Sequence, residues 1–359
     1  MKKWYEQTDG ERPAVVSSRV RLVRNWNRYV FPERMTETDS LDMIRQLKLG
    51  LRGLTQLDHR DYEYIDLQRL GDLDKKVLQE RRIINETIAA RKKPSGVILS
   101  EDECVEIVLN GTDHIRIQLL SAGLHLEELW KQADRIDDYI NEQIEYAFDE
   151  KYGYLTSFPT NMGTGLRASV VLHLPSLSMG KKFNGLAAEM SRFGVSVKSV
   201  YGEGNENYGA LYEVSNQKTL GISEKEILDL VARAAIQLST QERQVRKMAM
   251  EKHGLECADE AYKSYGVLKY ARRLSYKDAM TFLSQLMTGI ADGILETKDS
   301  CNVYRLMLGI QPANLQKLSD RPLGKEELDM ARASYLRREL PELRYKKLYG
   351  IDNKEDMME

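Results

Sequence analysis

The chain has 359 residues, enough for two domains with full hydrophobic cores, and its formal net charge is only −2 although 30% of its residues are charged. This balance argues against a protein that binds nucleic acid through a cationic surface. The three cysteines are far apart and form no CxxC pair, which favours a reducing compartment and argues against a structural zinc site. The N-terminal stretch "MKKWYEQTDGERP" lacks the apolar region of a signal peptide, and no stretch approaches the ~18 apolar residues of a membrane span, so we expect a cytoplasmic protein.

The first part of the chain is predicted to be mostly helical over residues 36–93, because cap-type residues open stretches with apolar residues three to four apart. From 97 to about 121 the pattern changes to strands, and 124–149 has the pattern of a long amphipathic helix. Three more strand-like stretches follow, "TGLRASVVLHLP", "GVSVKSVYGEG" and "GALYEVSNQ", with a short helical piece between the first two. This order fits a mixed sheet with helices packed on it, whose short connections allow antiparallel pairing.

The last third of the chain is predicted to be all helical. Ser223 and Glu226 form a capping box, which opens a helix that could run to Gly254. Residues 255–347 continue the helical pattern, with breaks at glycines and prolines. We therefore expect a domain boundary near 245–255.

Four arginines stand on the polar faces of predicted strands. Arg19 and Arg21 share one face of "SSRVRLVRN", Arg116 alternates with Ile115 and Ile117 in "HIRIQ", and Arg167 follows the turn "PTNMGTG". Arginine stays charged and offers a planar fork of donors, so a cluster of arginines suits an oligophosphate and can stabilise a phosphoryl group during transfer. Spacing alone does not show that the four converge, and scattered arginines are usually solvated or paired with acids.

Two glycine-rich stretches carry weaker signals. "TNMGTGLRASV" lacks the GK[ST] ending of a phosphate-binding loop and leads into a strand, so a structural turn is favoured. "YGEGNENYG", residues 201–209, is predicted to be a loop between strands, where Glu203 and Glu206 could orient a cationic substrate, bind magnesium together with a nucleotide, or be exposed loop acids. The histidines have no metal-ligand spacing, and no metal site is predicted.

Four stretches together resemble the ATP:guanido phosphotransferases (phosphagen kinases) in order and spacing: "SSRVRLVRN", "NGTDHIRIQ", "FPTNMGTGLRASVVLHLP" and "YGEGNE". Within that family the chain is most similar to the bacterial protein-arginine kinases of the McsB type. Only 16 residues precede the first stretch, the loop reads "YGEG", and a helical region follows the catalytic part. The resemblance implies an α+β fold: an antiparallel sheet flanked by helices over residues 1–250, with a helical N-terminal part over 1–93 and the sheet part over 94–250. A helical dimerisation and regulatory domain is then expected over 251–359.

The resemblance also implies a nucleotide site in which arginines face the phosphates of ATP. Its expected members are Ser18, Arg19, Val20, Arg21, Leu22, Arg82, Arg116, Arg167, Ala168, Ser169, Val170, Val171, Lys198, Ser199, Val200, Tyr201, Gly202 and Glu203. Lys198 stands where the family usually has another arginine, and Arg82 falls near a position that is commonly histidine. ATP and Mg²⁺ are the implied cofactors.

Catalytic roles follow for three acids by the same resemblance: Glu206 and Glu203 would align the target guanidinium, and Asp113 is retained. The family typically carries two glutamates before this aspartate, where the chain has Gly111 and Thr112. A guanidinium with a pKa above ~12 is a poor nucleophile unless a carboxylate aligns it, and loss of such an acid costs on the order of 10²–10⁴ in rate.

Two further positions depart from the family pattern. Phe158 replaces a common cysteine near the substrate. The family's "RDxxRA" phosphoarginine-binding motif corresponds here to Leu328, Asp329 and Arg332, and leucine cannot bind a phosphate. Asp329 and Arg332 could equally be a helical pair three residues apart.

The leading interpretation is a protein-arginine kinase that transfers the γ-phosphoryl group of ATP to arginines of proteins. Its implied setting is a homodimer in the stress response, with a zinc-binding activator protein and a Clp-type protease system as partners. The alternative is a catalytically impaired relative that binds nucleotide or protein and acts as a regulator. A kinase for small guanidino substrates is disfavoured by the short segment before the first motif.

Overall fold

The structure is a computed structural model and describes residues 1–180, 183–202 and 206–344. Within these residues, eight strands form one antiparallel sheet in the order β2-β3-β4-β5-β1-β8-β10-β9. The strands are β1 (Val15–Arg24), β2 (Tyr62–Asp66), β3 (Gly96–Ser100), β4 (Val105–Leu109), β5 (Ile115–Ala122), β8 (Leu166–His173), β9 (Val195–Ser199) and β10 (Leu211–Asn216). A separate hairpin joins β6 (Phe148–Asp149) and β7 (Gly153–Tyr154). The antiparallel sheet with flanking helices confirms the predicted fold class.

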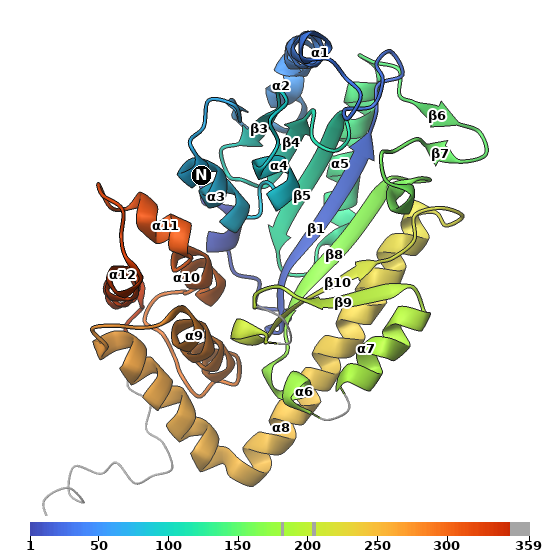
Figure 1. Ribbon diagram of the computed structural model, residues 1–359. Helices are drawn as coiled ribbons and strands as arrows, with labels where there is room; N and C mark the ends of the chain where they lie inside the picture. The colour runs from blue at the N-terminus through green and yellow to red at the C-terminus, as the bar shows by residue number, and fades with distance from the viewer. Residues whose placement is uncertain (181–182, 203–205, 345–359) are drawn as a thin grey trace, which may run out of the picture.

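Helices cover the sheet and form the C-terminal part (Figure 1). The first group is α1 (Glu37–Gly50), α2 (Leu54–Asp58), α3 (Asp72–Glu80), α4 (Glu86–Ala89), α5 (Leu126–Asn141), α6 (Pro175–Met179) and α7 (Phe183–Arg192). The second is α8 (Glu224–Tyr270), α9 (Tyr276–Ala291), α10 (Val303–Gly309), α11 (Pro312–Lys317) and α12 (Lys325–Glu339). Short 3₁₀ turns occur at Trp4–Glu6, Leu51–Gly53, Pro159–Asn161 and Tyr208–Ala210.

Alternation along the central strands separates an apolar face from a polar one. Val20 and Leu22 of β1 are fully buried, and their face packs against α5 and α8 in the main core. Arg24 lies on this same face and is buried too, but its guanidinium binds Asp137 of α5 at 2.7 and 3.0 Å. This pair ties β1 to α5, and it is a structural arginine because its partner belongs to the fold.

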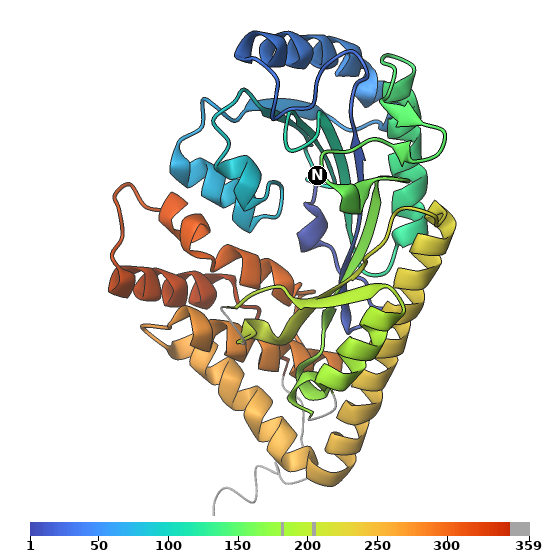
Figure 2. The same ribbon diagram turned by 45° about the vertical axis from the view of Figure 1, so that its right-hand side comes forward.

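The opposite face of the sheet also carries a core at one end. Val16, Leu120, Val171 and Leu211 pack there with apolar residues of the C-terminal helices. Figure 1 and Figure 2 show α9 to α12 gathered at this end, beside α3. The helical C-terminal part, as far as the structure describes it, therefore covers one end of the face that carries the predicted arginines and does not cover the rest of that face.

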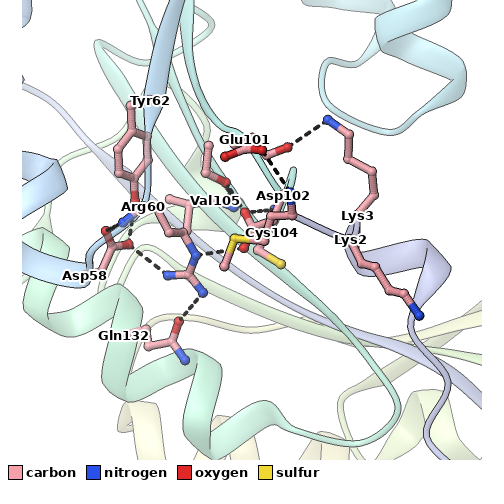
Figure 3. Close-up of polar contacts among 12 residues, drawn as sticks. Lys2, Lys3, Asp58, Arg60, Tyr62, Glu101, Asp102, Cys104, Val105 and Gln132 are labelled. Carbon is pink, nitrogen blue, oxygen red and sulfur yellow. Dashed lines mark hydrogen bonds and ion pairs between the residues drawn. The ribbon is translucent and has the colours of Figure 1, made fainter.

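A polar cluster holds the start of the chain and the residues before β2 against the turn that follows β3 (Figure 3). Arg60 donates to Asp102 at 2.9 Å, to Asp58 at 2.8 Å and to Gln132 at 3.5 Å. Lys3 donates to the backbone oxygen of Glu101 at 2.7 Å. Because the guanidinium of Arg60 is hydrogen-bonded to side chains of the protein, we assign this cluster a structural role.

Three elements differ from the sequence-based expectation. The stretch 36–93, expected to be mostly helical, contains β2, which pairs along β3 as an edge strand. Helix α5 ends at Asn141, short of 149, because Ala147 donates to the backbone oxygen of Asn25 and Tyr146 pairs with Trp26. Helix α8 begins at the predicted capping box but runs past Gly254 to Tyr270, with a kink at His253. The placement of the domain boundary near 245–255 stays a prediction.

Candidate active site

Four predicted arginines gather on the polar face of the central strands. Arg21 of β1 lies opposite Arg167 of β8 and opposite Gln118 of β5, so these side chains project to the same side. Arg19, two residues earlier, donates to the hydroxyl of Ser169 at 3.1 Å. Arg116 lies two residues before Gln118 and shares its face. Strand pairing thus brings together side chains from β1, β5 and β8 that are far apart in sequence.

Glu213 of β10 links this group to the helical N-terminal part. Arg19 donates to both of its carboxylate oxygens, at 2.9 and 3.0 Å, and Arg82 contacts one of them. Burial favours the neutral form of Glu213, but Arg19 and Arg82 outweigh it and lower the pKa of this carboxyl to about 2. Glu213 is therefore ionised at neutral pH and holds two cationic side chains in place.

Arg116 is held by a second acid. Its guanidinium donates to Glu106 of β4 at 2.9 Å and to the backbone oxygen of Ile83 at 2.7 Å, and it is 7% exposed. Burial raises the pKa of the Glu106 carboxyl to about 8, against the opposing effect of Arg116. The charge of Arg116 is consequently only partly compensated in this structure.

Arg21 and Arg167 differ from the other arginines of the face. In the part of the chain that the structure describes, neither guanidinium has an ion pair or hydrogen bond. Burial and the neighbouring charges of Arg19, Arg116 and Arg167 lower the pKa of Arg21 to about 9. Like charges placed directly opposite on a sheet repel each other. This pair is thus a site where an anion would be stabilised strongly.

A cavity of about 550 Å³ opens beside Arg82 and Glu213, the carboxylate that also binds Arg19. Its lining comes from α3, the ends of β9 and β10, and the start of α11: Lys76, Gln79, Glu80, Arg82, Lys198, Ser199, Val200, Tyr201, Glu213 and Gln311. Lys198 faces the same side as Glu213, its partner across β9 and β10. Gly202 follows with φ +135°, and a Cβ there would lie 1.9 Å from the backbone oxygen of Glu206, so this position requires glycine.

The remaining predicted residues of β1 and β8 add no charged side chain to the arginine face. Val20, Leu22, Ala168 and Val170 are fully buried in the main core on the opposite face. The hydroxyl of Ser18 donates to the backbone oxygen of Gly123 at 2.7 Å. Val171 lies on the arginine face, in the core shared with the C-terminal helices. These residues shape the strands that carry the arginines.

The three predicted acids are not grouped with the arginines by any described contact. Asp113 accepts from Asn25 at 2.8 Å and from the backbone N–H of Ser157 at 2.7 Å, while its second oxygen is buried without a partner among described residues. Glu206 is half-exposed and pairs with Lys277 of α9 at 2.9 Å. Glu203 lies outside the described residues.

The positions that depart from the family pattern lie near Asp113. Gly111 is buried, and a Cβ there would lie 3.2 Å from Val108, a tight contact. Thr112 is partly exposed, and its backbone oxygen accepts from the hydroxyl of Ser157 at 2.7 Å. Phe158 is 51% exposed in the adjoining loop. A longer side chain at Thr112 therefore has access to solvent, whereas Gly111 has little free space.

The predicted regulatory pair is an internal contact. Arg332 of α12 is 2% exposed and donates to Asp329 at 2.6 Å, to the backbone oxygen of Leu274 at 2.9 Å and to that of Ile310 at 3.3 Å. Asp329 and Arg332 are thus the pair three residues apart that the helical pattern allowed, and Arg332 also connects three segments of the C-terminal part.

The alternation of "HIRIQ" places Gln118 on the face of Arg116, but sequence reasoning missed Glu213 and Glu106 as residues of this face. Each occupies an alternating polar position in a predicted strand, so its side of the strand could have been inferred from the pattern. Their pairing with particular arginines depends on the order of strands in the sheet, which a single sequence does not reveal.

Comparison with known proteins finds a matching family for each of the two parts of the chain. The family described as "ATP:guanido phosphotransferase, C-terminal catalytic domain" matches residues 42–245, and the "Protein-arginine kinase McsB C-terminal domain" matches residues 254–349. The chain is 38% identical over 330 residues to a protein-arginine kinase of Caldanaerobacter subterraneus, covering 92% of this chain and 98% of the relative. It is 39% identical over 341 residues to the protein-arginine kinase of Bacillus velezensis, covering 95% and 93%.

Solved structures agree on the fold. A lombricine kinase superposes with a TM-score of 0.58 at 24% identity, covering 70% of each chain. The duplicated taurocyamine kinase of Schistosoma mansoni, solved with bound transition-state analogue components, superposes with a TM-score of 0.55 at 24% identity and covers 67% of this chain and 33% of its own. At this level of identity the likeness extends to the fold alone.

Proposed function

The chain belongs to the ATP:guanido phosphotransferase family, among its protein-arginine kinases, and from this premise we propose how the arginine face acts. The enzyme transfers the γ-phosphoryl group of ATP to the guanidinium of an arginine in a protein substrate. Arg21 and Arg167 carry the proposal, because they are two opposed, partly buried cations without a described partner. A polyphosphate bound across them would relieve their repulsion.

The remaining cations extend this clamp. Arg19 and Arg116 flank Arg21 on the same face, while Arg82 and Lys198 line the adjoining cavity, which would accept the rest of the nucleotide. Fixed donors around a transferring phosphoryl group stabilise its spread charge without covalent participation of the protein. Lysine at 198 offers a point charge instead of a planar fork, so its phosphate contact is not bidentate.

The chemical step needs an aligned guanidinium. One nitrogen of the target arginine attacks the γ-phosphorus, the P–N bond forms as the bond to the leaving oxygen of ADP breaks, and the guanidinium loses a proton. We assign Glu206 and Glu203 to the alignment of this guanidinium, with Asp113 holding the turn before β5. Since Gly111 and Thr112 leave the neighbouring position without a carboxylate, we expect slow turnover.

Mg²⁺ is assigned to the nucleotide. Among the described residues no group of three or more His, Cys, Asp or Glu side chains could hold a metal ion. Mg²⁺ is commonly held by substrate phosphates, water and one or two carboxylates, so it needs no larger group of protein ligands. The ion would neutralise charge on the phosphates while the arginines fix their direction.

Several features of the cellular setting are proposed from the resemblance alone. They are a cytoplasmic location, a homodimer, a role in the stress response, a zinc-binding activator protein and a Clp-type protease system. No described helix is long and apolar enough to cross a membrane. The regulatory alternative, an impaired relative, draws on Gly111, Thr112 and Leu328, but the relatives named above are kinases and give it no support.

The test is phosphoarginine formation on casein with Mg-ATP. We expect product from the natural protein and a loss of about 10²-fold or more in Arg167→Ala, which removes a phosphate donor without leaving an acid unpaired. Arg135→Ala, an exposed arginine on α5, is the matched control and should keep full activity. Thr112→Glu should raise the rate by restoring a carboxylate beside the target guanidinium.

Two results would change the conclusion. Activity only in Thr112→Glu would mean that the clamp is intact while the chemical step has been lost, and the regulatory reading would replace the kinase. Equal activity of Arg167→Ala and Arg135→Ala would show that the arginine face is not the phosphate site.

A further inference from the structure

The helical C-terminal part is attached directly to the segment that carries Arg82. Glu80, the last residue of α3, accepts from the backbone N–H groups of Ala313 and Asn314 and from the side-chain amide of Asn314, each at 2.8 Å. A carboxylate at this place satisfies the free donors at the start of α11. The ion pair between Lys317 and Asp74, at 2.5 Å, adds a second link between α11 and α3, which lie side by side in Figure 1 and Figure 2.

Arg82 follows Glu80 by two residues and is held from the sheet side as well. Its backbone has φ +66°, a conformation that an arginine rarely adopts without support. Gln118 donates to the backbone oxygen of Arg82 at 3.2 Å, and Arg116 donates to that of Ile83 at 2.7 Å. The sheet and α11 therefore both hydrogen-bond to the segment 80–83, and the backbone path of this segment depends on both.

A residue of α10 reaches the side chain itself. Tyr304 is fully buried, its ring packs against Trp4 with centroids 5.9 Å apart, and its hydroxyl interacts with the guanidinium of Arg82. The same hydroxyl lies 3.5 Å from that of Tyr201, at the edge of the nucleotide cavity. Gln311, next to α11, lines this cavity too.

We propose that Glu80 and Tyr304 are positioning residues through which the C-terminal helices set the place of Arg82, and with it the affinity for ATP. This inference rests on the proposed function, because it takes Arg82 as part of the nucleotide site. Arg82 reaches the Glu213 carboxylate that also holds Arg19, so a shift of Arg82 would change the phosphate clamp. An effect on bound nucleotide that persists unchanged into the transition state alters KM and leaves kcat as it is.

Two variants test the two contacts in the full-length protein, each with a matched control. Glu80→Gln leaves one acceptor for three donors, and its control is Glu242→Gln, because Glu242 likewise accepts two backbone N–H groups at the start of α6. Tyr304→Phe removes the hydroxyl and keeps the ring. Its control is Tyr265→Phe, whose hydroxyl donates to the backbone oxygen of Pro341 in the same C-terminal part.

The measurements are equilibrium binding of ATP without protein substrate, and KM and kcat with it. We expect Glu80→Gln and Tyr304→Phe to weaken ATP binding and raise KM for ATP by roughly three- to tenfold with kcat within about twofold, while both controls keep natural values. Equal ATP affinity of each variant and its control would overturn the inference and leave the kinase proposal standing. A natural protein that neither binds ATP nor forms phosphoarginine would overturn the proposed function, and the inference with it.

Discussion

The guanidinium of Arg82 contacts the carboxylate of Glu213 across 131 positions of sequence. Arg82 comes from the segment after α3, whereas Glu213 lies on β10 near one edge of the sheet. Since Arg19 of the central strand β1 binds the same carboxylate, one acid joins three parts of the chain at the wall of the nucleotide cavity. The shared carboxylate offsets the repulsion between these two cations.

Glu213→Gln should make stability depend less on pH. The pKa of Glu213 is about 2 in the folded protein and near 4.5 in the unfolded chain, so its stabilisation is present above about pH 4.5 and is lost as the pH falls towards 2. We expect the variant to be less stable than the natural protein by about 3 kcal/mol at pH 7, with the difference shrinking below pH 4.5. Urea unfolding at pH 7, 5 and 3 measures it.

The control for this experiment is Glu63→Gln, an exposed acid on the edge strand β2. It should change the free energy of unfolding little at any of the three pH values. A constant difference between Glu213→Gln and the natural protein down to pH 3 would contradict the assignment of Glu213 as an ionised link between arginines.

Arg21→Met should stabilise the protein and abolish its response to nucleotide. Burial and three neighbouring arginines lower the pKa of Arg21 to about 9, which means that its charge opposes folding in the absence of an anion. We expect the melting temperature to rise by about 2–5 °C, from a gain of roughly 1–2 kcal/mol. Mg-ATP should raise the melting temperature of the natural protein and not that of the variant.

Thermal unfolding with and without Mg-ATP decides this prediction, beside Arg135→Met as an exposed control. The control should show the natural shift with ATP. A lower melting temperature in Arg21→Met without ligand would indicate that Arg21 has a stabilising partner, and an unchanged ATP shift would remove it from the nucleotide site.

Arg332→Ala should act on stability. The substitution leaves Asp329 and two backbone oxygens without a donor inside the C-terminal part, at a cost of about 3 kcal/mol. Arg338→Ala on the same helix removes an exposed arginine and should cost less than ~1 kcal/mol. Unfolding in urea compares the two, and a similar small loss in both would show that the internal contacts of Arg332 contribute little.

The shared face of Arg19 and Arg21 was predictable because side chains alternate along a strand. Once "SSRVRLVRN", "HIRIQ" and "GLRASVV" are taken as strands, Arg19 and Arg21 must share a side, and the apolar residues between them must face the core. The capping box at Ser223 likewise marked the start of α8 correctly, since its two hydrogen bonds are local. Patterns within about ten residues thus carried this part of the fold.

Contacts between distant segments were not predictable in the same way. The contact between Glu213 and Arg82 joins β10, which lies beside β8, to the segment after α3. The period of side chains encodes neither this order of strands nor the packing of that segment. The cap that Glu80 forms on α11 depends on how two helical parts dock. Strand β2 was missed because five residues between helices carry too short a pattern.

Helix α8 passes from one hydrophobic core into another without an intervening loop. Its first half packs with Val231 and Leu238 against the sheet, and its second half packs with Ala261 and Leu268 among the C-terminal helices. A polypeptide truncated at residue 250 would expose to water the apolar residues of the sheet that pack against the C-terminal helices. The remaining half of α8 would end without the helices that its second half contacts. The catalytic portion is consequently no self-sufficient module, and each portion acts as scaffold for its neighbour.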